Sequence, residues 1–139
     1  MDVLGHEGVG RVVAIGDGVN PSTVRVGDRV GISWVRDVCG KCPSCLLPDG
    51  ETRCVQQLNS GRKWDGTFAE YCVVPSRYIL LLPDDLGLSD EVIAPILCGG
   101  VTAYKALRSF RYSDTSVAYV VSTISKSRSR SASCVLVWP

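Results

Sequence analysis

Four closely spaced cysteines constrain this 139-residue chain more than any other feature of its sequence. Cys39, Cys42, Cys45 and Cys54 form the pattern C-x2-C-x2-C-x8-C. Two-residue gaps let consecutive thiolates turn towards one point, and the longer loop returns the fourth sulfur to complete a tetrahedron. The pattern therefore predicts a zinc ion closed off by four thiolates, which would fold a long polar lobe over about 38–65.

Two alternatives to zinc are open for these cysteines. Three cysteines at two-residue gaps also begin ferredoxin motifs, although here the fourth cysteine is distant and is followed by Val55, not by proline. Disulfides are the second alternative, and the odd total of seven cysteines in a chain that opens without a signal peptide disfavours them. We keep zinc as the prediction and an iron–sulfur cluster as its competitor.

Composition and charge disfavour several kinds of partner. The chain has 45% hydrophobic and 21% charged residues, which is typical of a globular protein. Its formal net charge of +1 gives no electrostatic reason to expect nucleic acid or an anionic membrane as partner. No apolar run approaches the roughly 18 residues that a membrane-spanning helix needs. Since the first residues also lack the pattern of a signal peptide, we expect a cytoplasmic protein.

The first hundred residues, which glycine and proline punctuate, predict strands joined by turns. Apolar and β-branched runs indicate strands over 8–16, 28–35, 67–74 and 78–82. Short strands at such intervals favour a barrel or a sandwich. Two helical stretches follow, one that begins at Ser89 and contains Pro95, and one over 101–110. We expect their apolar stripes to pack on the core.

The composition changes near residue 110. All 14 glycines lie at or before Gly100, and residues 111–139 carry four basic groups against one acidic group. We expect 109–139 to be a serine-rich, disordered tail unrelated to the domain before it. The three basic residues in its middle are too few to hold nucleic acid tightly. Its apolar flanks could pair as strands, which we interpret as an aggregation liability.

A second group of candidate metal ligands is scattered along the chain. The single histidine, His6, stands between glycines beside Glu7, and Cys98 precedes Gly99-Gly100 at the junction of the two helical stretches. Imidazole and thiolate are both zinc ligands. A lone histidine is nevertheless most often an ordinary surface or core residue. Spacing alone cannot link His6 to Cys98.

Several motifs follow one another in a recognisable order. They are GHEGVGRVVAIGDGV, GDRVGISWV, the CGKCPSC…C lobe, WDGTFAEY and APILCGGVTAYKAL. In this order they resemble the zinc-dependent medium-chain alcohol dehydrogenases, most closely the yeast and fungal enzymes, over residues 4–108. The resemblance implies a mainly β fold, an incomplete GroES-like barrel over 1–108, with a zinc-binding lobe and short helices.

The same resemblance implies roles for individual residues. Thr102 matches a position near the nicotinamide ring, and Cys72 has no counterpart and is expected to be buried in a strand. The implied reaction oxidises a small alcohol to an aldehyde or ketone with NAD(P), and the full-length family is usually oligomeric. For a catalytic zinc it implies the ligands His6 and Cys98, with Glu7 as the acid beside the metal, either a transient ligand or one step removed from the ion. For a structural zinc it implies Cys39, Cys42, Cys45 and Cys54.

Two departures from the family pattern bear on activity. The family has a further catalytic-zinc cysteine before its GHE motif, which here would precede Met1. The G-x-G-x-x-G loop of the family's Rossmann domain occurs nowhere in the chain. We therefore expect a fragment truncated at both ends, without the Rossmann domain and with little or no activity alone. The alternative is a non-catalytic zinc-binding module folded around the four-cysteine site.

Overall fold

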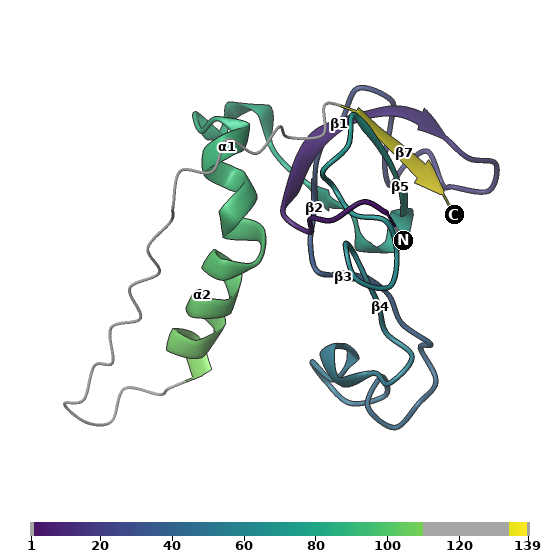
Figure 1. Ribbon diagram of the computed structural model, residues 1–139, viewed down its shortest axis with the longest axis vertical. Coiled ribbons are helices and arrows are strands. Elements are labelled where there is room, and N and C mark those ends of the chain that lie inside the picture. Colours follow the sequence, from purple (N-terminus) through teal and green to yellow (C-terminus); the bar gives the residue numbers. More distant parts are fainter. Residues whose placement is uncertain (1, 110–133, 139) are drawn as a thin grey trace.

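Two β-sheets and a short helical arm make up the part of this protein that the structure describes (Figure 1). The structure is a computed structural model that describes residues 2–109 and 134–138, with the backbone alone at 107–109 and 134–138. Within these residues the fold is mainly β and the larger sheet does not close into a barrel. The predicted fold class, an incomplete barrel with a cysteine lobe and short helices, is confirmed. No helix in the described ranges has the length and apolar character needed to cross a membrane.

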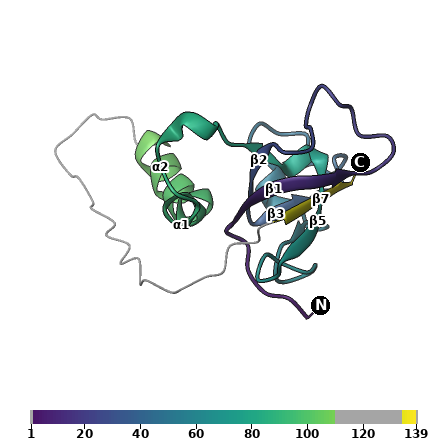
Figure 2. The ribbon, with the colours of Figure 1, turned by 90° about the horizontal axis from the view of Figure 1, so that it is seen from above.

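The larger sheet has five strands in the order β5-β7-β1-β2-β6. Figure 2 shows β7 between β1 and β5. β1 pairs with β2 in antiparallel fashion from Gly8↔Ile32 to Arg11↔Arg29, whereas β7 lies parallel to both β1 and β5. The smaller sheet joins β3 and β4 at the base of the cysteine lobe. The strand bounds are β1 Gly8–Ile15, β2 Arg29–Ile32, β3 Val35–Asp37, β4 Leu58–Asn59, β5 Tyr71–Pro75, β6 Leu80–Leu81 and β7 Cys134–Trp138.

The observed strands follow the predicted ones, with shifted ends. The strand expected over 28–35 divides into β2 and β3, because the chain bends at Ser33 and Trp34 before it enters the lobe. The strand expected over 67–74 begins only at Tyr71, since the preceding residues hydrogen-bond to the segment before β1 instead. The strand expected over 78–82 is reduced to β6.

β1 contributes to two separate hydrophobic clusters. Val12 packs with Val30 and Val74 in one cluster, and Val9 packs with Ile93 and Leu97 in the other. Side chains alternate along a strand, so Val9 and Val12 lie on opposite faces of β1. The first cluster packs the strands of the larger sheet together, and the second packs the helical arm against this sheet.

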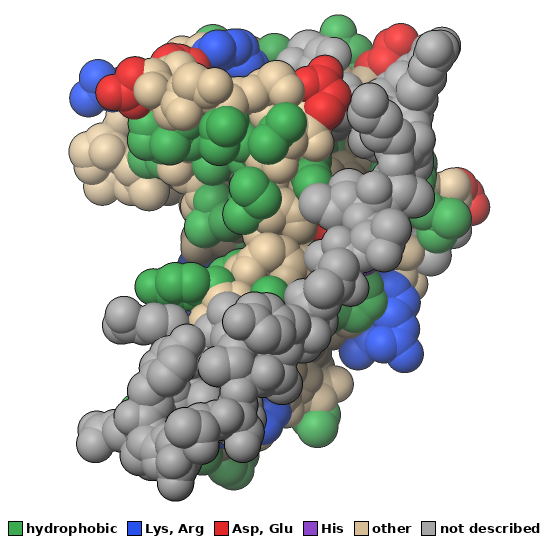
Figure 3. Space-filling view, turned by 90° about the vertical axis from the view of Figure 1, so that its left-hand side faces the viewer, with side chains coloured by type: hydrophobic (Ala, Val, Ile, Leu, Met, Phe, Trp, Pro, Cys, Tyr) green, Lys and Arg blue, Asp and Glu red, His purple; other side chains and the backbone are tan. Residues whose placement is uncertain are grey.

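The helical arm comprises α1 Asp90–Ile93, a 3-10 turn Ala94–Leu97 and α2 Gly99–Ser109. Ser89 occupies the N-cap position with an extended backbone, and Pro95 lies in the 3-10 turn that interrupts the helix, as predicted. The expected packing of the first apolar stripe is confirmed for Ile93 and Leu97 only, because Val92 and Ile96 are exposed. The expected packing of the second stripe is wrong where its side chains are described, since Ala106 is exposed and Ala103 is half-buried. Figure 3 views the side on which α1 and α2 lie, where hydrophobic side chains gather at the surface.

The end of the chain differs from the predicted disordered tail. Cys134–Trp138 form β7, which lies between β1 and β5 inside the larger sheet. The physical reason is that the facing edges of β1 and β5 carry backbone groups that an apolar, β-branched segment can pair with. Residues 110–133 lie outside the described residues, and the domain boundary at 108 stays a prediction.

Hydrogen bonds from Arg29 join β2 to the start of α1. Its guanidinium is only 8% exposed, and it donates from Nε to Asp90 Oδ1 and from Nη2 to the Leu88 carbonyl oxygen, both at 2.9 Å. Asp90→Ala leaves a buried cation without its anion, so we expect the free energy of unfolding to fall by about 2 kcal/mol. Urea titration followed by tryptophan fluorescence measures it.

The matched control for this variant is Asp85→Ala, which removes an exposed carboxylate from the neighbouring turn. Its effect should stay within about 0.5 kcal/mol. Equal effects of the two substitutions would contradict the proposed role of the Arg29–Asp90 pair.

Candidate metal centres

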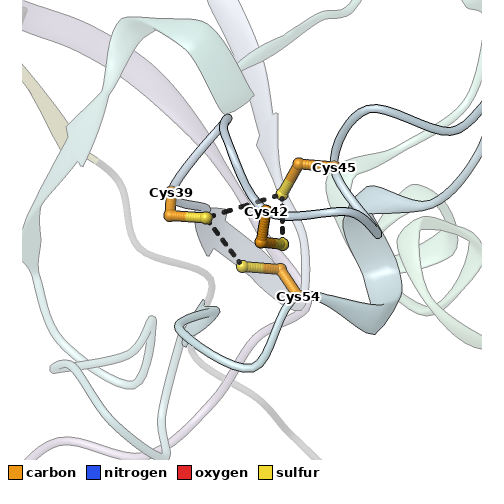
Figure 4. A group of neighbouring side chains, drawn as sticks. All are labelled: Cys39, Cys42, Cys45 and Cys54. Atoms are coloured by element: carbon orange, nitrogen blue, oxygen red, sulfur yellow. Dashed lines mark hydrogen bonds between the residues drawn. The ribbon is translucent and has the colours of Figure 1, made fainter.

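The four cysteines of the lobe converge on one point, as their spacing predicts (Figure 4). All four sulfurs lie within 4.8 Å of one another. The shortest separations are 3.5 Å for Cys42–Cys45, 3.7 Å for Cys39–Cys54 and 3.9 Å for Cys39–Cys45. A tetrahedron with metal–sulfur bonds of about 2.3 Å has edges of roughly 3.8 Å, so these sulfurs already stand at the separations that a four-thiolate zinc site requires.

Tight turns fold the lobe around these sulfurs. Backbone N–H groups of Leu46, Leu47 and Gly50 donate to the carbonyl oxygens of Cys42, Ser44 and Leu47 in turn. A Cβ at position 50 would overlap the Ser44 carbonyl oxygen, so only glycine allows this approach. Successive turns thus bring the loop back and deliver Cys54 to the other three sulfurs.

The lobe is anchored to the rest of the chain through Glu51. Its carboxylate accepts hydrogen bonds from Arg77 Nη2 at 2.5 Å and from Tyr78 Oη at 2.9 Å. Partial burial, and the hydrogen bond that it donates to Glu51, raise the pKa of Tyr78 to about 12. Tyr78 therefore stays protonated as a donor, and the lobe is fixed to the turn that follows β5.

The surroundings of the lobe shift the pKa values of Cys39 and Cys45 in opposite directions. Backbone N–H groups of Lys41 and Cys42 donate to the Cys39 sulfur and lower the pKa of Cys39 to about 6. Desolvation and the neighbouring thiols raise the pKa of Cys45 to about 12. In the cluster without a cation, the pKa of Cys39 therefore lies well below that of Cys45. A bound divalent metal ion would favour the thiolate form of all four.

A second donor cluster unites residues from both ends of the domain. Ligand atoms of His6, Glu7 and Cys98 lie within 4.8 Å of one another. Cys98 ends the 3-10 turn, and this turn is brought to β1 by the cluster of Val9 with Ile93 and Leu97. Three donors leave a coordination position free, which is the arrangement found at catalytic zinc sites.

Residues 65–68, at the end of the lobe and just after it, hold the segment that carries His6. Asp65 Oδ1 accepts hydrogen bonds from the backbone N–H of Asp2 at 2.8 Å and of Val3 at 3.3 Å, and these hold the pKa of Asp65 below its usual value. The N–H groups of Gly66 and Phe68 donate to the carbonyl oxygens of Val3 and Leu4. His6 is thereby fixed at the entrance to β1.

Two further features bear on this second cluster. Trp34 meets the His6 ring edge-to-face, with ring centroids 5.0 Å apart and planes at 77°. Partial burial and the negative charge of Glu7 raise the pKa of Cys98. Sequence reasoning missed the contact of Trp34 with His6, for which the only signal was an aromatic residue beside the bend after β2.

The remaining candidate residues lie outside both clusters. Thr102 is exposed in the first turn of α2, where its N–H donates to the Cys98 carbonyl oxygen at 3.0 Å. Cys72 lies in β5 and is 7% exposed, which confirms the expectation that it is buried. Burial raises the pKa of Cys72 to about 11. The structure therefore gives Cys72 a packing role and leaves Thr102 beside the second cluster.

The fold and its sites define an open β domain with two separate sets of side chains that could hold a metal ion. Residues 2–84 match the family described as "Alcohol dehydrogenase GroES-like domain", and the chain belongs to this family. An alcohol dehydrogenase of Geobacillus stearothermophilus is 51% identical over 107 residues, which make up 76% of this chain and 30% of the relative. Alcohol dehydrogenase 2 of Emericella nidulans is 45% identical over 107 residues, 76% of this chain and 28% of the relative.

Two solved structures share the fold of this chain. A cinnamyl alcohol dehydrogenase of Sorghum bicolor superposes with a TM-score of 0.60 at 26% identity, covering 77% of this chain and 31% of the other. The CAD of Helicobacter pylori, solved with NADP(H), shares the fold with a TM-score of 0.58 at 24% identity, covering 77% of this chain and 32% of the other. This chain spans about 30% of the length of its relatives. The predicted membership of the alcohol dehydrogenase family is confirmed.

The close approach at Gly50 gives a prediction for the cysteine lobe. Gly50→Ala forces the turn apart because the new Cβ meets the Ser44 carbonyl oxygen. We expect a loss of about 1–3 kcal/mol in Zn²⁺ binding by the lobe, measured by competition with a chromophoric chelator. Gly99→Ala is the matched control, because a Cβ there meets nothing within 4 Å. Wild-type affinity in Gly50→Ala would contradict the expected clash.

The buried thiol of Cys72 gives a second prediction, on reactivity. With a pKa of about 11, Cys72 is about 0.1% thiolate at pH 8. Iodoacetamide should therefore modify Cys72 at least about a hundredfold more slowly in the folded chain than in urea, where its pKa returns to about 8.5. Peptide mass spectrometry follows the modification. Equal rates in the two conditions would show that β5 does not protect this thiol.

Proposed function

We propose that this domain holds two zinc ions and forms part of an oxidoreductase that converts a small alcohol to an aldehyde or ketone with NAD(P). The observation that carries the proposal is the convergence of His6, Glu7 and Cys98 into a three-donor cluster, apart from the four-thiolate lobe. Membership of the alcohol dehydrogenase GroES-like family supports the reaction class.

The two donor sets suit different tasks. Four thiolates fill every position of a tetrahedral zinc and leave no room for substrate, so the lobe site is structural. His6 Nε2 or Nδ1, the Cys98 sulfur and a Glu7 oxygen would hold the second ion with a position left for substrate. A zinc ion there supplies Lewis-acid polarisation of the substrate oxygen.

This chain's own side chains prepare that second site. The edge-to-face contact with Trp34 limits the rotation of the His6 ring, so that its nitrogen faces Glu7 and Cys98. Exposed Thr102, one turn beyond Cys98, is the residue that we assign to the nicotinamide side of the site. We assign turnover to the complete family enzyme, because this chain spans about 30% of its relatives and contains no G-x-G-x-x-G loop.

Cobalt titration tests the proposal on the chain as it stands. Co²⁺ replaces Zn²⁺ at tetrahedral sites and absorbs visible light, so each site reports its own ligands. We expect about two equivalents of Co²⁺ per chain, in keeping with one ion per donor set. His6→Ala should remove one equivalent and keep the intense thiolate absorption of the lobe, and Cys54→Ser should weaken that absorption.

A substrate probe completes the test. Millimolar trifluoroethanol, an acidic alcohol, should shift the visible bands of the wild-type cobalt protein and leave those of His6→Ala unchanged. A single equivalent of Co²⁺ with no response to the alcohol would contradict the proposal and favour the alternative, a zinc-binding module. That alternative has its own observation, since the lobe sulfurs already stand at tetrahedral separations.

A further inference from the structure

β7 occupies a slot that is one strand wide between β1 and β5. Its backbone pairs with Arg11 to Ile15 of β1 on one side, with a register shift between Val12 and Ala14, and in continuous register with Tyr71 to Pro75 of β5 on the other. Among the described strands, β5 pairs with β7 alone, so β5 joins the larger sheet only through β7 (Figure 1). Without β7 the facing edges of β1 and β5 would both carry unpaired N–H and carbonyl groups.

The contacts of β7 with β1 and β5 are the same whether the strand belongs to this chain or to another copy. Residues 110–133 separate α2 from β7, and these 24 residues span at most about 80 Å when extended. A Cys134–Trp138 segment from another copy would form the same hydrogen bonds with β1 and β5. The free energies of the intrachain and interchain arrangements therefore differ mainly by the entropic cost of bringing two copies together.

We propose that the slot between β1 and β5 is a strand-acceptor site, and that it accepts the Cys134–Trp138 segment of a second copy of this chain as well as its own. Exchange in both directions gives a dimer in which each copy completes the sheet of the other. A tethered segment competes at an effective concentration on the order of millimolar. The exchanged dimer thus becomes the major form as the protein concentration approaches that value.

Register pairs allow a cross-linking test between copies of the full chain. Tyr71 is exposed and lies directly opposite Cys134 in the ladder. A chain carrying Tyr71→Cys and Cys134→Ser is mixed with the wild-type chain and oxidised with copper-phenanthroline. A disulfide between the thiol at position 71 and wild-type Cys134 can then form only between two copies. Peptide mass spectrometry identifies it.

The matched control replaces Val73, which lies on the same face of β5 but opposite Leu136. We expect the Tyr71→Cys mixture to give about ten times more interchain product than the Val73→Cys mixture, rising with concentration up to about 1 mM. Leu136→Pro in the wild-type partner should abolish the product, because proline cannot donate to the ladder.

A chain carrying Tyr71→Cys alone keeps its own Cys134 and shows whether the slot is filled from within. An intrachain disulfide at every concentration, with no interchain product in the mixtures, would overturn the proposal. Equal interchain yields from the Tyr71→Cys and Val73→Cys mixtures would also overturn it, because collisions between unpaired chains would then explain the cross-links. No product of either kind would show that β7 does not occupy the slot.

Discussion

The backbone of residues 2–5 runs so close to residues 65–68 that this contact joins the segments that carry the two candidate metal centres. Gly66 permits it, because a Cβ there would overlap the carbonyl oxygens of Leu4 and Gly5. The Asp65 carboxylate then binds the N–H groups of Asp2 and Val3. Since Asp65 ends the lobe and its partners lie in the segment that leads to His6, one short stretch of pairing relates the two candidate metal centres.

The same junction extends into the smaller sheet. Arg36 of β3 donates from Nη1 to the Asp65 carbonyl oxygen at 3.0 Å, and its guanidinium stacks 5.7 Å from the centre of the Trp64 ring. Burial lowers the pKa of Arg36, although the guanidinium stays charged at any neutral pH. The strand that leads into the lobe and the segment that carries His6 are thus held by one pair of adjacent residues, Trp64 and Asp65.

Sequence reasoning succeeded where the determinants are local. The spacing of the four cysteines predicts their convergence, because each ligand lies within a few turns of the next. His6 and Cys98 could be paired only through family resemblance, since their approach depends on the packing of Val9 against the helical arm. The position of β7 could not be predicted, because the edges that it pairs with are separated from it by more than fifty residues of chain.

Zinc K-edge X-ray absorption of the zinc-loaded chain tests the central claim that one small domain builds two different metal centres. A four-thiolate lobe and a His6–Glu7–Cys98 site predict an average of about 2.5 sulfur ligands per zinc at about 2.3 Å, with nitrogen and oxygen at about 2.0–2.1 Å. The sulfur average should rise towards four when His6→Ala empties the second site. An average of four in the wild-type chain would contradict the account, because only the lobe would then hold metal.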